Sequence, residues 1–231
     1  MATVTLRPVA DISLKHSCSS GSSGYAMINE ATADDDSTYI YQNITSTDTT
    51  TVTSQFKLGG TLANKGKIKI ESIDVYVDLK TTRSSIVTVT DYTEFYITVN
   101  GATGSTETVS MNSLRTDYSV ENHTYTASSF GIGDTEFSSL DDLTINLTLS
   151  TRGKASGKNS SFNLRITQIY AIVTYTESHA SEATGLYVKA NGTYKEVQAV
   201  YKKISGAWVQ QTDISSLFST TGKYKLKEAS E

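Results

Sequence analysis

The chain has 231 residues and a net charge of −4, with 37% hydrophobic and 19% charged residues. An acidic chain without a dense run of Lys and Arg offers little to nucleic-acid phosphates, so we expect no nucleic-acid partner. Ser and Thr make up more than a quarter of the chain, whereas Pro occurs once and Tyr 14 times. Because Thr and Tyr favour strands and O-glycosylated stalks are rich in Pro, the composition predicts an all-β protein.

The N-terminus shows no signal for export. Residues 1–11 lack an apolar core of signal-peptide length, and no stretch approaches the length of a membrane span. The single cysteine, Cys18, excludes an intrachain disulfide and fits a reducing cytoplasm. We therefore expect a chain that is made in the cytoplasm and does not insert into a membrane.

Alternating apolar residues predict strands along the first 177 residues. The first strand is Thr3–Arg7, which Pro8 is expected to end. The later strands are Thr38–Tyr41, Thr51–Leu58, Lys67–Leu79, Ile86–Thr90, Glu94–Val99, Leu143–Ser150 and Phe162–Thr176. Their number and spacing predict an antiparallel β-sandwich, and long late strands that pair back on early ones favour a jelly roll over a meander.

Three local patterns refine this prediction. The apolar phase of Lys67–Leu79 breaks near Ser72, which predicts a bulge or a bend there. Met111–Tyr118 has apolar residues at roughly helical spacing, so one short helix is expected. Within Phe162–Thr176 the even-numbered residues are expected to share one face of the strand and the odd-numbered residues the other.

The C-terminal part is predicted to be a separate small domain. Residues 1–177 form the sandwich, 178–185 are small and polar and form a linker, and 186–231 form the small domain. Tyr187, Lys189, Gly192 and Tyr194 recur fourteen residues later as Tyr201, Lys203, Gly206 and Trp208. Each copy has the pattern strand, turn and strand, so we predict two β-hairpins. In them Lys189 is expected to lie opposite Tyr194, and Lys203 opposite Trp208. A last strand is predicted over Lys223–Lys227.

The hairpins carry one candidate ligand site. A face that sets aromatic rings beside Lys stems can stack on sugar rings, and its residues are Tyr187, Lys189, Tyr194, Tyr201, Lys203 and Trp208. The alternative is that this face packs against the sandwich, against the turn predicted over Ile214–Phe218, or against a neighbouring subunit. The sequence favours the packing alternative.

The sequence contains no catalytic motif. His16, His123 and His179 lie in polar contexts and have no partners at the spacing of a metal site or a triad. Paired carboxylates for glycoside cleavage could come only from Asp141–Asp142 or from the Asp34 group, and nothing places either in a cleft. We therefore predict a protein that is not an enzyme and that has no catalytic residues and no cofactor.

A second candidate site is acidic. Glu30, Asp34, Asp35 and Asp36 offer the clustered carboxylates that a Ca²⁺ ion requires. The alternative is that these residues form turns and cap backbone N–H groups before the strand that starts at Thr38. The sequence favours the alternative.

Several segments resemble virion proteins of tailed phages and prophages of Gram-positive bacteria, or of phage-tail-like particles. They are Val4-Thr5-Leu6-Arg7-Pro8, Gly24-Tyr25, Ile28-Asn29-Glu30, the run from Asp34 to Ile40, Ile166-Thr167-Gln168-Ile169-Tyr170 and Val173-Thr174-Tyr175. The resemblance covers about residues 3–177, and the hairpins are similar to small modules appended to phage tail and wall-associated proteins. It implies a jelly-roll-like domain and supplies no catalytic residues.

These features together predict a non-enzymatic structural protein of a phage particle, as a head decoration, a fibre or a tail component. Its expected partners are other virion proteins, copies of itself and, for attachment, a host-surface glycan. A virion protein is assembled in the host cytoplasm and leaves by lysis, which agrees with the missing export signal. The alternative function is a carbohydrate-binding module that recognises cell-wall glycans.

Overall fold

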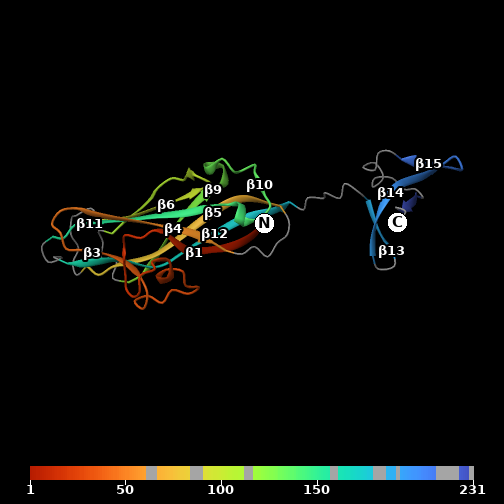
Figure 1. Cartoon of the computed structure of the whole chain (residues 1–231). Coiled ribbons are helices and arrows are strands. Elements are labelled where there is room, and N and C mark those ends of the chain that lie inside the picture. Colours follow the sequence, from red (N-terminus) through yellow and green to blue (C-terminus); the bar gives the residue numbers. More distant parts are fainter. Residues whose placement is uncertain are drawn as a thin grey trace. The chain divides into compact units, whose positions relative to one another are not determined.

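The computed structural model describes residues 1–60, 67–83, 91–111, 117–156, 161–178, 186–190, 193–211 and 224–228. Contacts divide the chain into two compact units, Met1–Ser178 and His179–Glu231. Residues 179–185, most of the predicted linker, lie outside the described part. Strands dominate both units (Figure 1), and within the described ranges no helix is long and apolar enough to cross a bilayer.

The described residues of the first unit form twelve strands and three short 3-10 turns, and those of the second unit form four strands. The strands of the first unit are β1 (Ala2–Ser13), β2 (Ser17–Cys18), β3 (Ile40–Ile44), β4 (Thr50–Gly59), β5 (Lys67–Thr81), β6 (Tyr92–Val99), β7 (Ala102–Thr103), β8 (Glu107–Ser110), β9 (Ser119–Thr126), β10 (Glu136–Phe137), β11 (Ile145–Gly153) and β12 (Phe162–Ser178). The turns are η1 (Tyr25–Met27), η2 (Ala127–Phe130) and η3 (Leu140–Asp142). The second unit has β13 (Leu186–Ala190), β14 (Thr193–Ile204), β15 (Ala207–Gln211) and β16 (Tyr224–Glu228).

The first unit is an antiparallel β-sandwich with the strand order of a jelly roll. Sheet A runs β1–β12–β5–β9 and sheet B runs β4–β11–β6–β8, and every neighbouring pair is antiparallel. Among these long strands the first pairs with the last and the second with the next to last, which is how a jelly roll alternates between its sheets. The predicted all-β sandwich is therefore confirmed, and the pairing of late strands with early ones is as expected.

Strand β1 belongs to both sheets. Ala2–Leu6 pairs with β12 of sheet A, and Arg7–Ser13 pairs with β4 of sheet B. The prediction that Pro8 ends this strand is wrong, because Pro8 lies at a register shift just after the strand changes sheets. A residue without an N–H is tolerated there because the ladder of hydrogen bonds is interrupted where the strand passes between sheets.

A bulge in β5 accounts for the broken apolar pattern of that strand. Ser72 pairs with Thr174 and Ile70 pairs with Tyr175, so Glu71 is an extra residue without a partner in the register. Ile70 is buried on one side of the bulge and Glu71 is exposed. The predicted bulge near Ser72 is confirmed, and it keeps the apolar residues on both sides of it facing the core.

A second bulge in β12 was not predicted. The register shifts between Ile166 and Gln168, which makes Thr167 the extra residue. The expected unbroken alternation of faces is therefore wrong, because the bulge exchanges the two faces at Thr167. The buried apolar residues are Phe162, Leu164 and Ile166 before the bulge and Ile169, Ala171, Val173 and Tyr175 after it.

The core lies between the two sheets and consists of their inward side chains. Its largest fully buried members include Phe56 and Phe95 of sheet B and Ile40, Ile73 and Leu79 of sheet A. Strand β9 contributes little to this core, since only Tyr125 of that strand is buried. That polar edge strand, like the short strand β8, was missing from the strands predicted by apolar alternation.

The second unit is built from hairpins, as predicted. Strand β14 pairs with β13 through its first half and with β15 through its second half, and β16 pairs with the second half of β14 along its other edge. Ser205 and Gly206 have φ angles of 49° and 91°, which is the geometry of a type I′ turn. The predicted last strand corresponds to β16, whereas the Asn191–Gly192 turn and the Ile214–Phe218 turn lie outside the described residues.

Two further predictions concern the sandwich. The Asn100–Gly101 turn is confirmed, with φ angles of 50° and 87°. Most of the helix predicted over Met111–Tyr118 and the strand predicted over Ile86–Thr90 lie outside the described residues.

Candidate functional site

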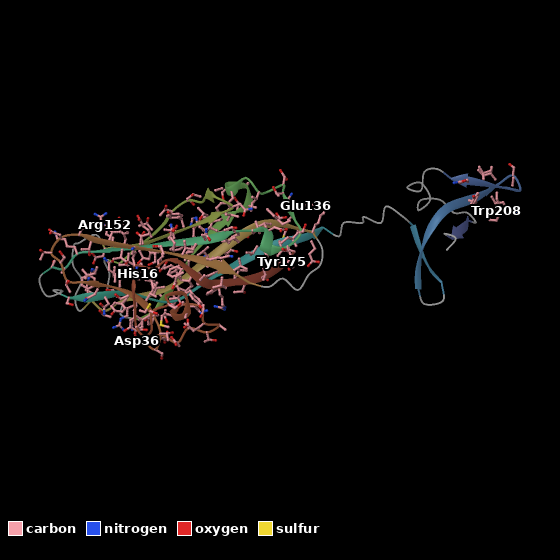
Figure 2. All side chains as sticks on the ribbon, in the orientation of Figure 1. His16, Asp36, Glu136, Arg152, Tyr175 and Trp208 are labelled. Atoms are coloured by element: carbon pink, nitrogen blue, oxygen red, sulfur yellow. The ribbon has the colours of Figure 1, made fainter. Side chains whose placement is uncertain are left out.

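The solvent side of sheet A is rich in tyrosine. Along β5 the side chains of Val75, Val77 and Leu79 are buried, so the residues between them point outward. The outward side chains of β5, β12 and β3, together with neighbouring loop residues, form a surface that we call the tyrosine face. Asp36, which is labelled in Figure 2, lies at one end of it. Its tyrosines are Tyr39, Tyr41, Tyr76, Tyr118 and Tyr170.

Residues 28–38 form a fixed border of the tyrosine face. Strands β3 and β1 pair with different parts of one edge of β12 and leave residues 167–170 between them. The loop takes that place, because the N–H of Ile169 donates to the carbonyl of Ile28 at 2.9 Å. The hydroxyl of Thr167, the bulge residue, donates to a loop carbonyl 2.9 Å away. The bulge thus anchors the loop to the sheet.

Asp36 joins the charged and aromatic groups at one end of the tyrosine face. Its carboxylate accepts from Lys80 Nζ at 2.5 Å and from Arg165 Nη1 at 2.7 Å. The ammonium of Lys80 lies 4.5 Å from the centre of the Tyr118 ring, and the guanidinium of Arg165 lies 4.4 Å from that of Tyr39. The hydrogen bond from Lys80 is the main cause that lowers the pKa of Asp36. The charged side chains at this end of the tyrosine face are therefore already paired with one another.

The four carboxylates proposed for Ca²⁺ do not converge. Asp36 is directed to the two cations, whereas Glu30 and Asp34 meet at Thr38. The Thr38 hydroxyl lies 2.7 Å from Glu30 Oε1, and Asp34 Oδ1 accepts from the Thr38 N–H at 3.0 Å. No group of three His, Cys, Asp or Glu side chains within the described ranges is arranged for a metal. The geometry favours the capping alternative.

Tyr76 and Tyr170 form a stacked pair at the other end of the tyrosine face. Their ring centres are 4.6 Å apart and their planes differ by 7°. The guanidinium of Arg7 lies 5.6 Å from the centre of the Tyr170 ring, so the stack spans β5, β12 and β1. On the side away from Tyr170, the cross-strand neighbour of Tyr76 is Asn122 of β9, which is exposed. No described aromatic or cationic group covers that side of the Tyr76 ring.

Asp78 lies next to this stack and is incompletely paired. It is the cross-strand neighbour of Gln168, and only 7% of it is exposed. Its Oδ1 atom is buried and accepts no hydrogen bond from any described residue. Burial raises the pKa of Asp78, and the negative charge of Asp35 adds to this effect. A buried carboxylate oxygen without a donor is costly.

The hairpin residues proposed for sugar binding keep their predicted register. Lys189 pairs with Tyr194, Tyr187 with Glu196, and Lys203 with Trp208. The ammonium of Lys203 lies 6.0 Å from the centre of the Trp208 ring, and 44% of Trp208 is exposed. Tyr201 is partly exposed, while the side chains of Tyr187, Lys189 and Tyr194 lie outside the described part. Their binding role stays a proposal.

The second carboxylate group considered for glycoside cleavage has a capping role. Asp142 Oδ2 accepts from the N–H groups of Ser138 and Ser139 at 2.9 Å and 3.0 Å. The side chain of Asp141 lies outside the described residues. The geometry of Asp142 is that of a turn cap rather than of an acid that faces a substrate.

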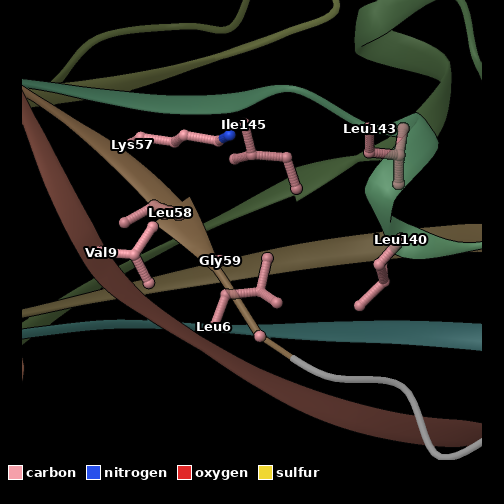
Figure 3. Close-up of a pocket in the computed structure, with 9 residues that line it drawn as sticks. Leu6, Val9, Lys57, Leu58, Gly59, Leu140, Leu143 and Ile145 are labelled. Carbon is pink, nitrogen blue, oxygen red and sulfur yellow. The ribbon is translucent and has the colours of Figure 1, made fainter.

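One apolar pocket lies apart from the tyrosine face. It has a volume of about 280 Å³ and is lined by Leu6, Leu58, Leu140 and Ile145, with Lys57 among its lining side chains (Figure 3). This volume falls below the usual range of sites for small molecules, which starts at roughly 300 Å³. The pocket is therefore a gap in the packing between β1, β4 and β11 and does not compete with the tyrosine face as a site.

No family model and no curated protein sequence matches the chain. Among solved structures it is similar to a family 35 carbohydrate-binding module from an environmental isolate, with a TM-score of 0.33, 12% identity and coverage of 76% of this chain and 97% of that chain. It is also similar to TmCBM61 in complex with β-1,4-galactotriose, with a TM-score of 0.29, 10% identity and coverage of 60% of this chain and 72% of that chain. A third similar structure is that of infectious bursal disease virus Gt strain, with a TM-score of 0.25, 18% identity and coverage of 62% of this chain and 38% of that chain. These likenesses are distant and assign no partner to this chain.

Proposed function

We propose that the sandwich unit is a binding module that holds a neutral glycan on the tyrosine face, beside Tyr76, Tyr170 and Asp78. The observation that carries this proposal is the stacked Tyr76–Tyr170 pair, one side of which no described aromatic or cationic group covers. Sugar hydroxyls donate hydrogen bonds, and the C–H faces of sugar rings pack on aromatic rings. The stack supplies the ring and Asp78 supplies the acceptor.

The charges around the stack favour a neutral glycan over an acidic one. Asp78 and Asp74 lie on the outward side of β5, and Asp35 is close enough to raise the pKa of Asp78. Arg7 is the cation that stacks on Tyr170, and its guanidinium also donates to the carbonyl of Glu30. A uronate or sulfate group placed beside the aspartates would be repelled.

We expect Asp78→Asn and Tyr170→Ala to abolish or strongly weaken glycan binding. Loss of a hydrogen bond to a charged acceptor costs about 1.5–3 kcal/mol, which corresponds to a decrease in affinity of roughly 10- to 100-fold. The measurement is an array of neutral and uronate-containing cell-wall oligosaccharides, followed by calorimetry with the best neutral oligosaccharide. Asp78→Asn should melt no lower than the parent, since it removes a buried charge next to Asp35.

Two variants serve as matched controls. Tyr96→Ala removes an outward, partly buried tyrosine from β6 of sheet B, on the opposite side of the sandwich. Trp208→Ala removes the exposed ring of the second unit. Both should bind as the parent does. Loss of binding in Trp208→Ala alone would show that the hairpins, and not the tyrosine face, bind the glycan. If the parent bound no neutral glycan on the array, the proposal would be refuted.

A second proposal is that the chain is a structural component of a virion, assembled in the host cytoplasm. The outer side of sheet B favours it, because its hydroxyl and amide side chains bond across strands and leave a largely uncharged surface. Thr53 and Ser150 are 2.8 Å apart, and Gln55 donates to Thr148 at 3.3 Å. Such a surface suits stacking against copies of itself. Sedimentation that shows a monomer at all concentrations, together with no binding to phage particles, would contradict it.

A further inference from the structure

A hydrogen-bonded line of Ser105, His123 and Glu107 lies where β9 of sheet A and β8 of sheet B approach each other. His123 is in β9, the edge strand of sheet A, and Glu107 is the first residue of β8 at the edge of sheet B. Ser105 Oγ lies 3.1 Å from His123 Nε2, and Glu107 Oε2 lies 2.9 Å from His123 Nδ1. The three residues are brought together by the fold and not by any sequence motif.

The chemistry of the partners fixes the direction of these hydrogen bonds. An ionised carboxylate only accepts, so a neutral His123 carries its proton on Nδ1 and donates it to Glu107. Nε2 then has a free lone pair, and the Ser105 hydroxyl donates to it. This is the order of nucleophile, base and orienting carboxylate that activates serine in acyl-transfer enzymes.

The buried ring of Tyr125 supports the group formed by Ser105, His123 and Glu107. The Tyr125 ring, of which 2% is exposed, contacts the His123 ring edge-on with centres 4.5 Å apart. The same ring lies against Gly104, where an added Cβ would come within 2.7 Å of two ring carbons. The Gly104 N–H donates to the Ile97 carbonyl at 2.9 Å. The Tyr125 ring therefore supports both the His123 imidazole and the backbone just before Ser105.

Stability does not require this arrangement. The side chains of His123 and Glu107 are 27% and 36% exposed, so water could satisfy them equally well. Exposed pairs of this kind contribute about 0–1 kcal/mol. Ser105 is itself exposed, so its hydroxyl is open to a reagent.

We propose that Ser105 is a nucleophile for acyl transfer from carboxylic esters, with His123 as its base and Glu107 as a positioning residue. The serine oxygen forms a bond to the carbonyl carbon while its proton moves to Nε2. The bond from that carbon to the alcohol oxygen breaks, and the alcohol leaves with the proton from Nε2. Water then attacks the acyl-serine by the same route and releases the carboxylic acid.

The test is covalent labelling of the full-length protein with a fluorophosphonate, read by intact mass and peptide mapping. The serine oxygen displaces fluoride, so one adduct at Ser105 is expected. A positioned base accelerates such steps by about 10²–10⁴-fold, so His123→Ala and His123→Gln should slow labelling at least 100-fold. Ser105→Ala should abolish the adduct, and Ser128→Ala, which changes an exposed serine of η2, should not alter it.

Glu107→Gln tests the positioning role separately. It should slow labelling while nitrogen-15 spectra of the imidazole show a loss of the Nδ1–H tautomer, which a purely structural role would not cause. Equal labelling of the parent and both His123 variants, with circular dichroism showing them folded, would overturn the proposal. Adducts spread over many serines with no preference for Ser105 would do the same. Neither result depends on whether the tyrosine face binds a glycan.

Discussion

Replacing Arg83 with Met should lower the free energy of unfolding by about 3–5 kcal/mol, as is typical when one member of a buried ion pair is removed. Arg83 and Asp91 form an ion pair in which both side chains are fully buried. Arg83 also donates to the Met111 carbonyl at 3.2 Å, and its guanidinium lies 4.5 Å from the centre of the Phe162 ring. Met fills a similar volume but leaves Asp91 charged and buried without its cation.

A second variant separates the cost of the unpaired charge from the loss of packing. Asp91 Oδ1 accepts from the Lys154 N–H at 3.0 Å, and Asn at position 91 keeps that acceptor while removing the charge. The double variant Arg83→Met, Asp91→Asn should therefore regain at least half of the lost stability. Urea unfolding of both single variants and the double variant gives the coupling energy of the pair.

An exposed pair provides the matched control. Lys69 Nζ lies 3.2 Å from Asp134 Oδ1, and the two side chains are 38% and 104% exposed. Lys69→Met should change the free energy of unfolding by no more than about 1 kcal/mol, because solvent screens this pair. An effect of Arg83→Met as small as that of Lys69→Met would show that the buried pair does not stabilise the sandwich.

Acid should destabilise the protein through protonation of His16. Burial lowers the pKa of His16 to about 4, against a value of about 6.5 in an unfolded chain. Between these values the unfolded chain binds a proton that the folded chain does not, so stability falls as the pH falls. The expected loss is about 2 kcal/mol between pH 7 and pH 5 and about 3 kcal/mol by pH 4.

The partners of His16 explain why its neutral form is required. Ser54 Oγ accepts from two backbone N–H groups, those of Lys15 and His16, so it donates its own proton to His16 Nδ1 at 2.8 Å. The Thr151 hydroxyl donates to Gln42 Oε1 at 2.7 Å and therefore accepts from His16 Nε2 at 2.8 Å. A proton on Nδ1 would place two donors face to face in a buried site.

The measurement is urea unfolding at several pH values for the parent, His16→Gln and His123→Gln. His16→Gln should lose the extra slope between pH 7 and pH 5, whereas His123→Gln, which changes a partly exposed histidine, should retain it. The readout is the slope with pH, so a lower stability of His16→Gln at pH 7 does not confuse it. The same slope in all three proteins would contradict the assignment.

The fold class and several local features follow from residue patterns over short stretches of the chain. Alternation of apolar residues places the core strands, because a strand exposes every second side chain to the same environment. The broken phase near Ser72 locates a bulge, and the Asn100–Gly101 and Ser205–Gly206 pairs locate type I′ turns. These features depend on the residues within a few positions, so they can be read from the chain alone.

The bulge at Thr167 cannot be predicted from local residue patterns. Both Thr167 and Gln168 are polar, so the sequence shows no break at the position where the faces of β12 exchange. What decides the bulge is the loop at residues 28–38, whose carbonyls accept from Thr167 and Gln168 and which lies far away in the sequence. The tyrosine face depends on that exchange, because it turns Tyr170 outward beside Tyr76.

Which polar groups meet depends on how distant parts of the chain pack together. The sequence allows the acidic residues to form one ion site but favours turn caps; the sheet presents Lys80 and Arg165 to Asp36 and so divides it from Glu30 and Asp34. The polar sequence around His16 predicts a loop residue, but its ring is buried between the hydroxyls of Ser54 in β4 and Thr151 in β11, and Thr151 donates to the amide oxygen of Gln42 in β3. Ser105 and His123 meet because two sheet edges adjoin. Burial and pairing are set by neighbours distant in the chain, so alternation fixes the layers but not the contacts between them.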